Sequence, residues 1–176
     1  HLEEGYLASN RIKWLTHLFS LITIAGLTAG SYATMTGHQI AYGISREVPW
    51  GILTASFAFF AITSTGLCLI AAISHAYGVT PLRPLGSRSV YLAIVTTVTA
   101  FMLLAFSVEN PWLLIYYNAV SPSLTSNIWW LSTLYGIMSG CLFLRFAFLI
   151  SGSKGAALSF GIIAAVAAVG ANNNLG

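Results

Sequence analysis

The sequence predicts an all-α integral membrane protein, a bundle of about five transmembrane helices. Of its 176 residues 57% are hydrophobic and only 6% are charged, whereas soluble domains carry roughly 25% charged residues. The mean hydropathy is +0.81. A helix needs about 20 mostly apolar residues to cross the hydrocarbon core of a bilayer. Five segments reach or approach that length, and we expect them to form a single transmembrane domain over residues 1–176: residues 12–35, 50–77, 89–108, 128–150 and 156–171.

The connections support these boundaries in turn. The segment "TGHQIAYGISREVP" reads as a polar loop, and its last residue, Pro49, suits the first turn of the second helix. Two prolines and a glycine in "GVTPLRPLGSR" predict an exposed turn before the third helix. The stretch "VENPWLLIYYNAVSPSLTSN" reads as a connection of about 20 residues, and connections of that length are usually functional. Ser126 or Asn127 is a suitable N-cap for the fourth helix.

The fifth apolar segment is the shortest and the richest in alanine and glycine. Two interpretations stay open. The segment is either a span interrupted by the end of the chain, or a helix packed closely on its neighbours through small residues.

The net charge of +3 comes from cations scattered singly at the ends of apolar segments. This distribution argues against nucleic-acid binding, which needs a basic patch, and it indicates membrane topology. Only Arg46 falls on the side opposite the N-terminus, so the N-terminus is predicted to be cytoplasmic. The cations on the N-terminal side are Arg11, Lys13, Arg83, Arg88 and Lys154, with Arg145 closer to that side within the fourth span.

Three polar residues near the membrane side opposite the N-terminus each have a functional and a structural interpretation. Glu109, at the end of the third span, either exchanges protons or is a solvated loop acid. Glu47 has the same two interpretations, or pairs with Arg46. His38 is either a solvated loop histidine or a partner for a proton or a quinone.

Aromatic residues gather at the depth of these groups, in greater number than membrane anchoring requires. Trp and Tyr favour the membrane interface, but flat aromatic walls with a few hydrogen-bond donors also suit a planar apolar ring such as a quinone head group. The residues are Trp50, Trp112, Tyr116, Tyr117, Trp129, Trp130 and Tyr135.

Other polar residues inside the spans give weaker signals. His17 and His75 lie near the same side of two spans, as a bis-histidine haem would require, although interfacial histidines are more frequent. Residues 63–65 place three hydroxyls in mid-span, where they either bond to their own helix or line a path for protons. Cys68 and Cys141 have neither metal-ligand nor disulfide spacing, so no metal site is predicted.

Residues Glu47 to Arg145, with "EVPWGILTASFAFFAITSTGLCLIAAISHAYGV" and then "ENPWLLIYYNAVSPSLTSNIWWLSTLYGIM", resemble the N-terminal half of NrfD-like proteins, the polysulfide reductase membrane-subunit family. The resemblance implies a multi-pass subunit of a bacterial or archaeal cytoplasmic membrane. Such a subunit exchanges electrons between menaquinone or ubiquinone and a ferredoxin-like iron–sulfur subunit. A molybdopterin or multihaem cytochrome subunit completes the complex, and the membrane subunit holds no haem or metal. Family members have eight or more spans, so this chain would be part of a longer one or a short relative.

One motif departs from the family pattern. In the family, an acid often stands four residues before the proline that follows the third span, and a basic residue stands directly before that proline. Here Ser107 stands at the position of the acid and Asn110 at the position of the basic residue, and Glu109 lies two positions after Ser107. The implied site has Glu109 or Glu47 as proton carrier and His38 or Tyr135 as hydrogen-bond donor to a ring oxygen. The chain would not be catalytic on its own. A redox-inactive membrane anchor is the alternative, and a small transporter the third. The remaining expected quinone-binding residues are Trp50, Asn110, Trp129 and Trp130.

Overall fold

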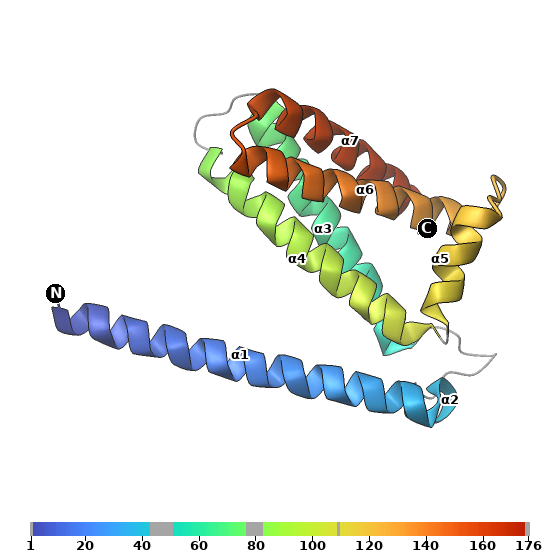
Figure 1. Cartoon of the computed structure of the whole chain (residues 1–176), viewed down its shortest axis with the longest axis horizontal. Coiled ribbons are helices and arrows are strands. Elements are labelled where there is room, and N and C mark those ends of the chain that lie inside the picture. The colour runs from blue at the N-terminus through green and yellow to red at the C-terminus, as the bar shows by residue number, and fades with distance from the viewer. Residues whose placement is uncertain (1, 43–50, 77–82, 109, 175–176) are drawn as a thin grey trace. The chain divides into compact units, whose positions relative to one another are not determined.

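The computed structural model describes residues 2–42, 51–76, 83–108 and 110–174. The described chain forms helices and divides into two compact units, His1–Gly51 and Ile52–Gly176. The helices are α1 (Leu2–Thr36), α2 (His38–Tyr42), α3 (Ile52–Ala76), α4 (Arg83–Ser107), α5 (Pro111–Val120), α6 (Asn127–Ile150) and α7 (Lys154–Asn173) (Figure 1).

Within the described residues, five helices are long and apolar enough to cross a membrane. They are Arg11–Thr36, Ile52–Ser74, Leu85–Ser107, Asn127–Ile150 and Lys154–Asn173. The chain is therefore an all-α, multi-pass membrane protein, as the sequence predicts. That these helices form one domain stays a prediction.

The first unit consists of α1 and the short helix α2. Hydroxyl groups along α1 donate to carbonyls of the preceding turn, for example Thr16 to the Ile12 oxygen at 2.8 Å and Thr23 to the Phe19 oxygen at 2.8 Å. Such bonds allow polar side chains in an apolar helix without leaving their hydroxyls unsatisfied. Gly37, between the two helices, has a φ of 98°, a conformation that glycine adopts without strain.

The second unit contains two antiparallel helix pairs, α3 with α4 and α6 with α7 (Figure 1). Small and hydroxyl side chains bring α3 and α4 together. The Ser64 hydroxyl on α3 donates to the Ala93 carbonyl on α4 at 3.0 Å and also bonds the Thr97 hydroxyl. Of the three hydroxyls at residues 63–65, Thr63 bonds back to its own helix, whereas Ser64 joins two helices.

Helix α7 packs through small side chains. Six alanines and one glycine are its buried residues: Ala157, Gly161, Ala164, Ala165, Ala167, Ala168 and Ala171. Without a hydrophobic force between helices in lipid, close approach of backbones through small residues provides the van der Waals contact. These buried small residues agree with the interpretation of the fifth apolar segment as a helix packed closely on its neighbours.

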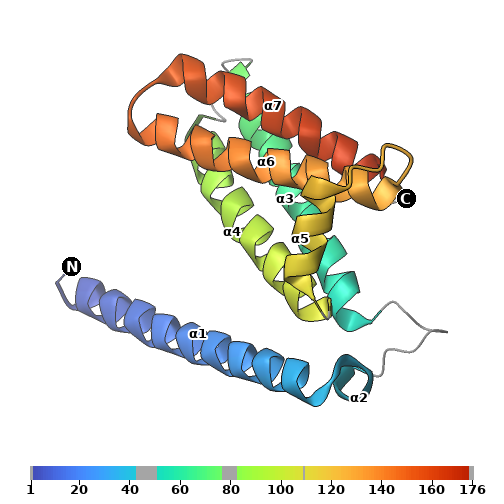
Figure 2. The ribbon, with the colours of Figure 1, turned by 45° about the vertical axis from the view of Figure 1, so that its right-hand side comes forward.

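Helix α5 is an addition to the predicted architecture. It covers 10 residues of the stretch that reads as a connection, with Pro111 at its first position, where the missing N–H of proline costs no hydrogen bond. Figures 1 and 2 both show α4 and α6 diverging toward the end of the unit where α5 links them. This end is called the α5 end below, and the opposite end, where α6 turns into α7, the α6–α7 turn end.

Candidate functional site: a recess between α4, α5 and α6

A recess of about 570 Å³ lies at the α5 end of the second unit. Its volume is within the range of roughly 300–1,000 Å³ that is typical of small-molecule sites. The walls are mostly apolar, with three polar side chains. The lining residues are Phe57 of α3; Phe101, Leu104, Ala105 and Val108 from α4 and its end; Pro111, Leu114, Ile115, Asn118 and Ala119 of α5; and Ile128, Leu131, Ser132, Tyr135 and Gly136 of α6.

The polar part of the wall is a hydrogen-bonded pair, Asn118 of α5 and Ser132 of α6. The Ser132 hydroxyl donates to Asn118 Oδ1 at 2.6 Å, and Asn118 Nδ2 donates to Thr133 Oγ1 at 3.2 Å. The Ser132 oxygen also lies 3.1 Å and 3.0 Å from the carbonyl oxygens of Ile128 and Trp129. Its single proton therefore has three acceptors within reach, and rotation toward a helix carbonyl would release Asn118 Oδ1.

Trp129 ties α5 to the start of α6. Its indole Nε1 donates to the Asn118 carbonyl at 2.8 Å. The Ser126 side chain accepts from the Trp129 backbone N–H at 3.3 Å, which confirms Ser126 as the N-cap of this helix. The indole of Trp130 donates instead to the Leu124 carbonyl in the preceding loop, at 2.9 Å. The two indoles meet edge to face, with ring centroids 5.0 Å apart.

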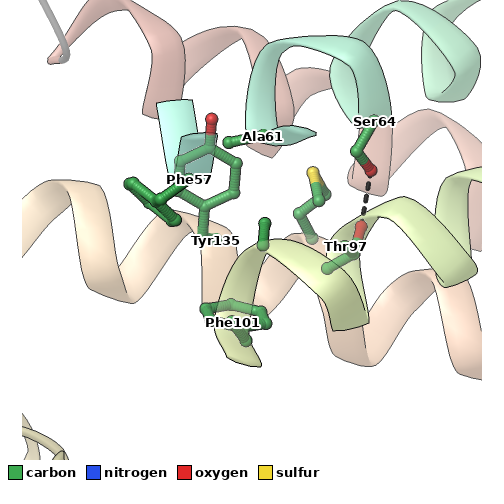
Figure 3. A pocket seen from close by; sticks show the side chains of 8 residues that line it. Phe57, Ala61, Ser64, Thr97, Phe101 and Tyr135 are labelled. Atoms are coloured by element: carbon green, nitrogen blue, oxygen red, sulfur yellow. Dashed lines mark hydrogen bonds between the residues drawn. The ribbon is translucent and has the colours of Figure 1, made fainter. Parts of the chain in front are cut away.

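The deep side of the recess is built from three aromatic rings. Figure 3 shows Phe57, Phe101 and Tyr135 converging from three helices, with the Tyr135 hydroxyl pointing away from Phe101. The rings of Phe57 and Tyr135 meet at 6.2 Å between centroids in an edge arrangement, which is favourable for aromatic pairs. Beyond them the helices pack around Ser64 and Thr97 with no space for a water molecule. The recess therefore ends at Tyr135.

The Tyr135 hydroxyl belongs to a second polar network, behind the recess. It donates to Asn172 Oδ1 of α7 at 3.0 Å, and Asn172 Nδ2 donates to Thr65 Oγ1 of α3 at 2.6 Å. Thr65 in turn donates to the Ala61 carbonyl at 3.1 Å. The chain of donors ends on a backbone oxygen, and its hydrogen bonds hold the Tyr135 hydroxyl in place.

The residues expected from sequence fall into three groups. Glu47, Trp50 and Glu109 lie outside the described residues, and His38 begins α2, although its side chain is outside the description. Asn110 is exposed at the start of α5 and makes no side-chain capping bond. Tyr135 lines the recess, and Trp129 and Trp130 bond backbone carbonyls beside it.

Two of the three polar recess residues, Asn118 and Ser132, were not expected from the sequence. Asn118 lies in the mostly apolar stretch "LLIYYNAV", and Ser132 lies beside Thr133 in the mostly apolar stretch "IWWLSTL". A polar residue at an interior position of an apolar helix needs a partner, so pairing these two was possible in principle. The fold shows that they are partners of each other.

Within the described part of the chain, no three His, Cys, Asp or Glu side chains gather closely enough to hold a metal ion. The described lining of the recess consists of apolar walls and three hydrogen-bonding side chains. Its chemistry suits a flat, mostly apolar ligand that carries one or two polar oxygens.

The fold and the recess together define a multi-pass membrane protein with a ligand-sized apolar site. Over 102 residues, 57% of this chain and 25% of the relative, the sequence is 28% identical to the Hdr-like menaquinol oxidoreductase integral membrane subunit of Archaeoglobus fulgidus. The chain thus spans about a quarter of that relative's length. No family model matches the chain, and no solved structure matches it significantly.

Proposed function

We propose that this chain is the quinol-interacting membrane subunit, or part of it, of a respiratory oxidoreductase, of the NrfD-like kind. The recess between α4, α5 and α6 is the observation that carries the proposal, and the similarity to a menaquinol oxidoreductase subunit supports it. The subunit binds the quinol in the membrane, an iron–sulfur partner accepts its electrons, and a further catalytic subunit uses them. The chain alone completes no reaction.

The recess has the two properties that a quinol head group needs. Aromatic and aliphatic walls receive the ring, with Tyr135 contributing its face rather than its hydroxyl, because that hydroxyl already donates to Asn172. Ile115, at the α5 wall, is 60% exposed. In this proposal a ligand dissolved in the hydrocarbon core enters the recess from the side of α5, where Ile115 is exposed.

The hydrogen-bonding partner for the head group is Asn118. A quinol hydroxyl that donates to Asn118 Oδ1 replaces the Ser132 hydroxyl, which then turns to the carbonyl of Ile128 or Trp129. No buried polar group is left unsatisfied by this exchange, so the exchange avoids the penalty of an unpaired polar atom.

Oxidation of a quinol to a quinone releases two electrons and two protons. In this proposal the electrons pass to the iron–sulfur partner. A titratable group must receive the protons. Glu109 is the first candidate. Val108 directly precedes it, Pro111 follows it by two positions, and both of these residues line the recess. Glu47 is the second, and His38, Trp50 and Asn110 stay proposed contributors to the site.

Two glycines one turn apart on α6 test the proposal. Gly136 lines the recess and Gly140 does not, yet a side chain at either position meets no other atom within 4 Å of its Cβ. Gly136→Leu fills the recess without disturbing the packing, and Gly140→Leu is the matched control. We expect quinol-dependent reduction of the partner subunit to fall at least about tenfold in the first variant and to stay normal in the second.

A redox-inactive anchor predicts a different outcome. An anchor would hold its partner subunits equally well in both variants and would show no quinol-dependent activity in either. Equal, normal quinol activity in both variants would place the quinol elsewhere and contradict the assignment of this recess.

A further inference from the structure

A second recess, of about 530 Å³, lies at the α6–α7 turn end of the second unit. This is the end opposite the recess between α4, α5 and α6, and it is where α6 ends and α7 begins (Figure 1). Its walls are partly apolar and partly polar, and one cationic side chain reaches it. The lining residues are Ser87 of α4, Phe148 and Leu149 of α6, Gly152 of the turn, and Lys154, Gly155 and Leu158 of α7.

The charged side chain in the lining of this recess is a cation. Lys154 lines it, and Arg88 follows the lining residue Ser87. The four acids of the chain are Glu3, Glu4, Glu47 and Glu109. None of them belongs to the described part of the second unit, residues 52–76, 83–108 and 110–174. An anion in the recess would meet Lys154 without a competing carboxylate from those segments.

Backbone donors add to the lysine. The first amides of a helix have no carbonyl acceptor within the helix, and at α7 these are the N–H groups of Lys154, Gly155 and residue 156. The N-cap residue, Ser153, makes no side-chain capping bond to them. A Cβ at Gly155 would meet no atom within 4 Å, so the recess is open beside this residue.

The apolar part of the wall distinguishes a lipid from a free anion. Phe148 and Phe160 stack with ring centroids 5.4 Å apart and an interplanar angle of 13°. Leu149 and Leu158 complete an apolar surface beside the cation. A phosphate ion uses only the polar half of such a recess, whereas a phospholipid places its phosphate at Lys154 and an acyl chain along the phenyl and leucyl groups.

We propose that this recess binds the head group of an anionic phospholipid, with Lys154 and the first amides of α7 on the phosphate and Phe148, Leu149 and Leu158 along an acyl chain. Cations beside a membrane surface attract anionic lipids, and helix N-termini favour phosphate. The site would hold one lipid at the leaflet on the α6–α7 turn side and would keep the turn of that helix pair in place.

The test uses the protein purified together with its partner subunits from bilayers that contain equal amounts of phosphatidylglycerol and phosphatidylcholine. Native mass spectrometry counts the lipids that stay bound. We expect phosphatidylglycerol to be retained in preference. Lys154→Gln is expected to lower its retention about fivefold, since one cation near the surface contributes at that level. Lys13→Gln, which removes the other lysine of the chain, is the matched control and should have no effect.

A second pair of variants leaves the charge unchanged. Gly155→Leu fills the recess and should also reduce retention, whereas Gly140→Leu, on an open part of α6, should not. The proposal is overturned if phosphatidylcholine is retained equally well, or if Lys13→Gln reduces retention as much as Lys154→Gln. It is also overturned if millimolar inorganic phosphate displaces the lipid completely, which would show an unspecific anion site only.

Discussion

The guanidinium of Arg145 lies in the space that a side chain at position 161 would need. Arg145 is 1% exposed within α6, and its Nη2 donates to the Ala71 carbonyl of α3 at 2.8 Å. A Cβ built on Gly161 of α7 would overlap the guanidinium. One arginine therefore joins three helices, and the glycine is the residue that allows it.

This relationship predicts a large effect from a small substitution. Gly161→Ala should lower the free energy of unfolding by about 1–3 kcal/mol, the usual cost of overpacking. Thermal unfolding of the detergent-purified protein measures this, with Gly66→Ala as control because its Cβ meets no atom within 4 Å. In an Arg145→Met background the cost of Gly161→Ala should largely disappear. An equal cost in both backgrounds would refute the arrangement.

Asn118 and Ser132 should differ in their effect on quinol binding. Asn118→Leu removes the proposed acceptor of the quinol hydroxyl and should raise the KM for quinol about tenfold, the upper value for one hydrogen bond. Ser132→Ala removes only the group that the quinol displaces, so its KM should stay within about twofold of the unaltered protein. Steady-state quinol oxidation by the purified complex measures both. A larger effect from Ser132→Ala would reverse the two roles.

The two adjacent tryptophans donate to different carbonyls, so their substitutions should have different effects on quinol binding. Trp129→Phe removes the indole donor to the Asn118 carbonyl, and Trp130→Phe the donor to the Leu124 carbonyl in the loop. Each loss should cost about 1 kcal/mol of stability. Only Trp129→Phe should also raise the quinol KM, because α5 carries a wall of the recess. If both variants change KM equally, the indoles act on the ligand by some route other than α5.

Tyr135→Phe tests whether the hydroxyl or the ring of this residue matters. The variant keeps the ring and leaves Asn172 Oδ1 without the donor that it has now. We expect a stability loss of about 1–3 kcal/mol, the cost of an unsatisfied buried polar group, and an unchanged KM for quinol. A raised KM with normal stability would instead favour the hydroxyl as donor to a ring oxygen.

The long helices could be predicted from the sequence because a bilayer imposes both a length and an apolar composition on a spanning helix. The structure extends the fifth span to Lys154–Asn173. Helix α5 could not be predicted in the same way. Its 10 residues are too few for a span, and the prolines around it are typical of a turn.

The candidate site was less predictable than the fold. A tyrosine near the start of a span, Tyr135, is visible as a candidate in the sequence. That Asn118 faces Ser132 follows from how α5 folds back on α6, which depends on contacts across a loop. Arg145 likewise reads as a topology signal, and only the packed helices show that it is buried against Ala71.

The most direct test of the quinol assignment is photolabelling of the purified complex with an azido-naphthoquinone, followed by mapping of the labelled peptides. We expect label within residues 111–119 and 128–136, competed away by excess menaquinol and lost in Gly136→Leu but not in Gly140→Leu. Label confined to other segments, with these two peptides unmodified, would contradict it.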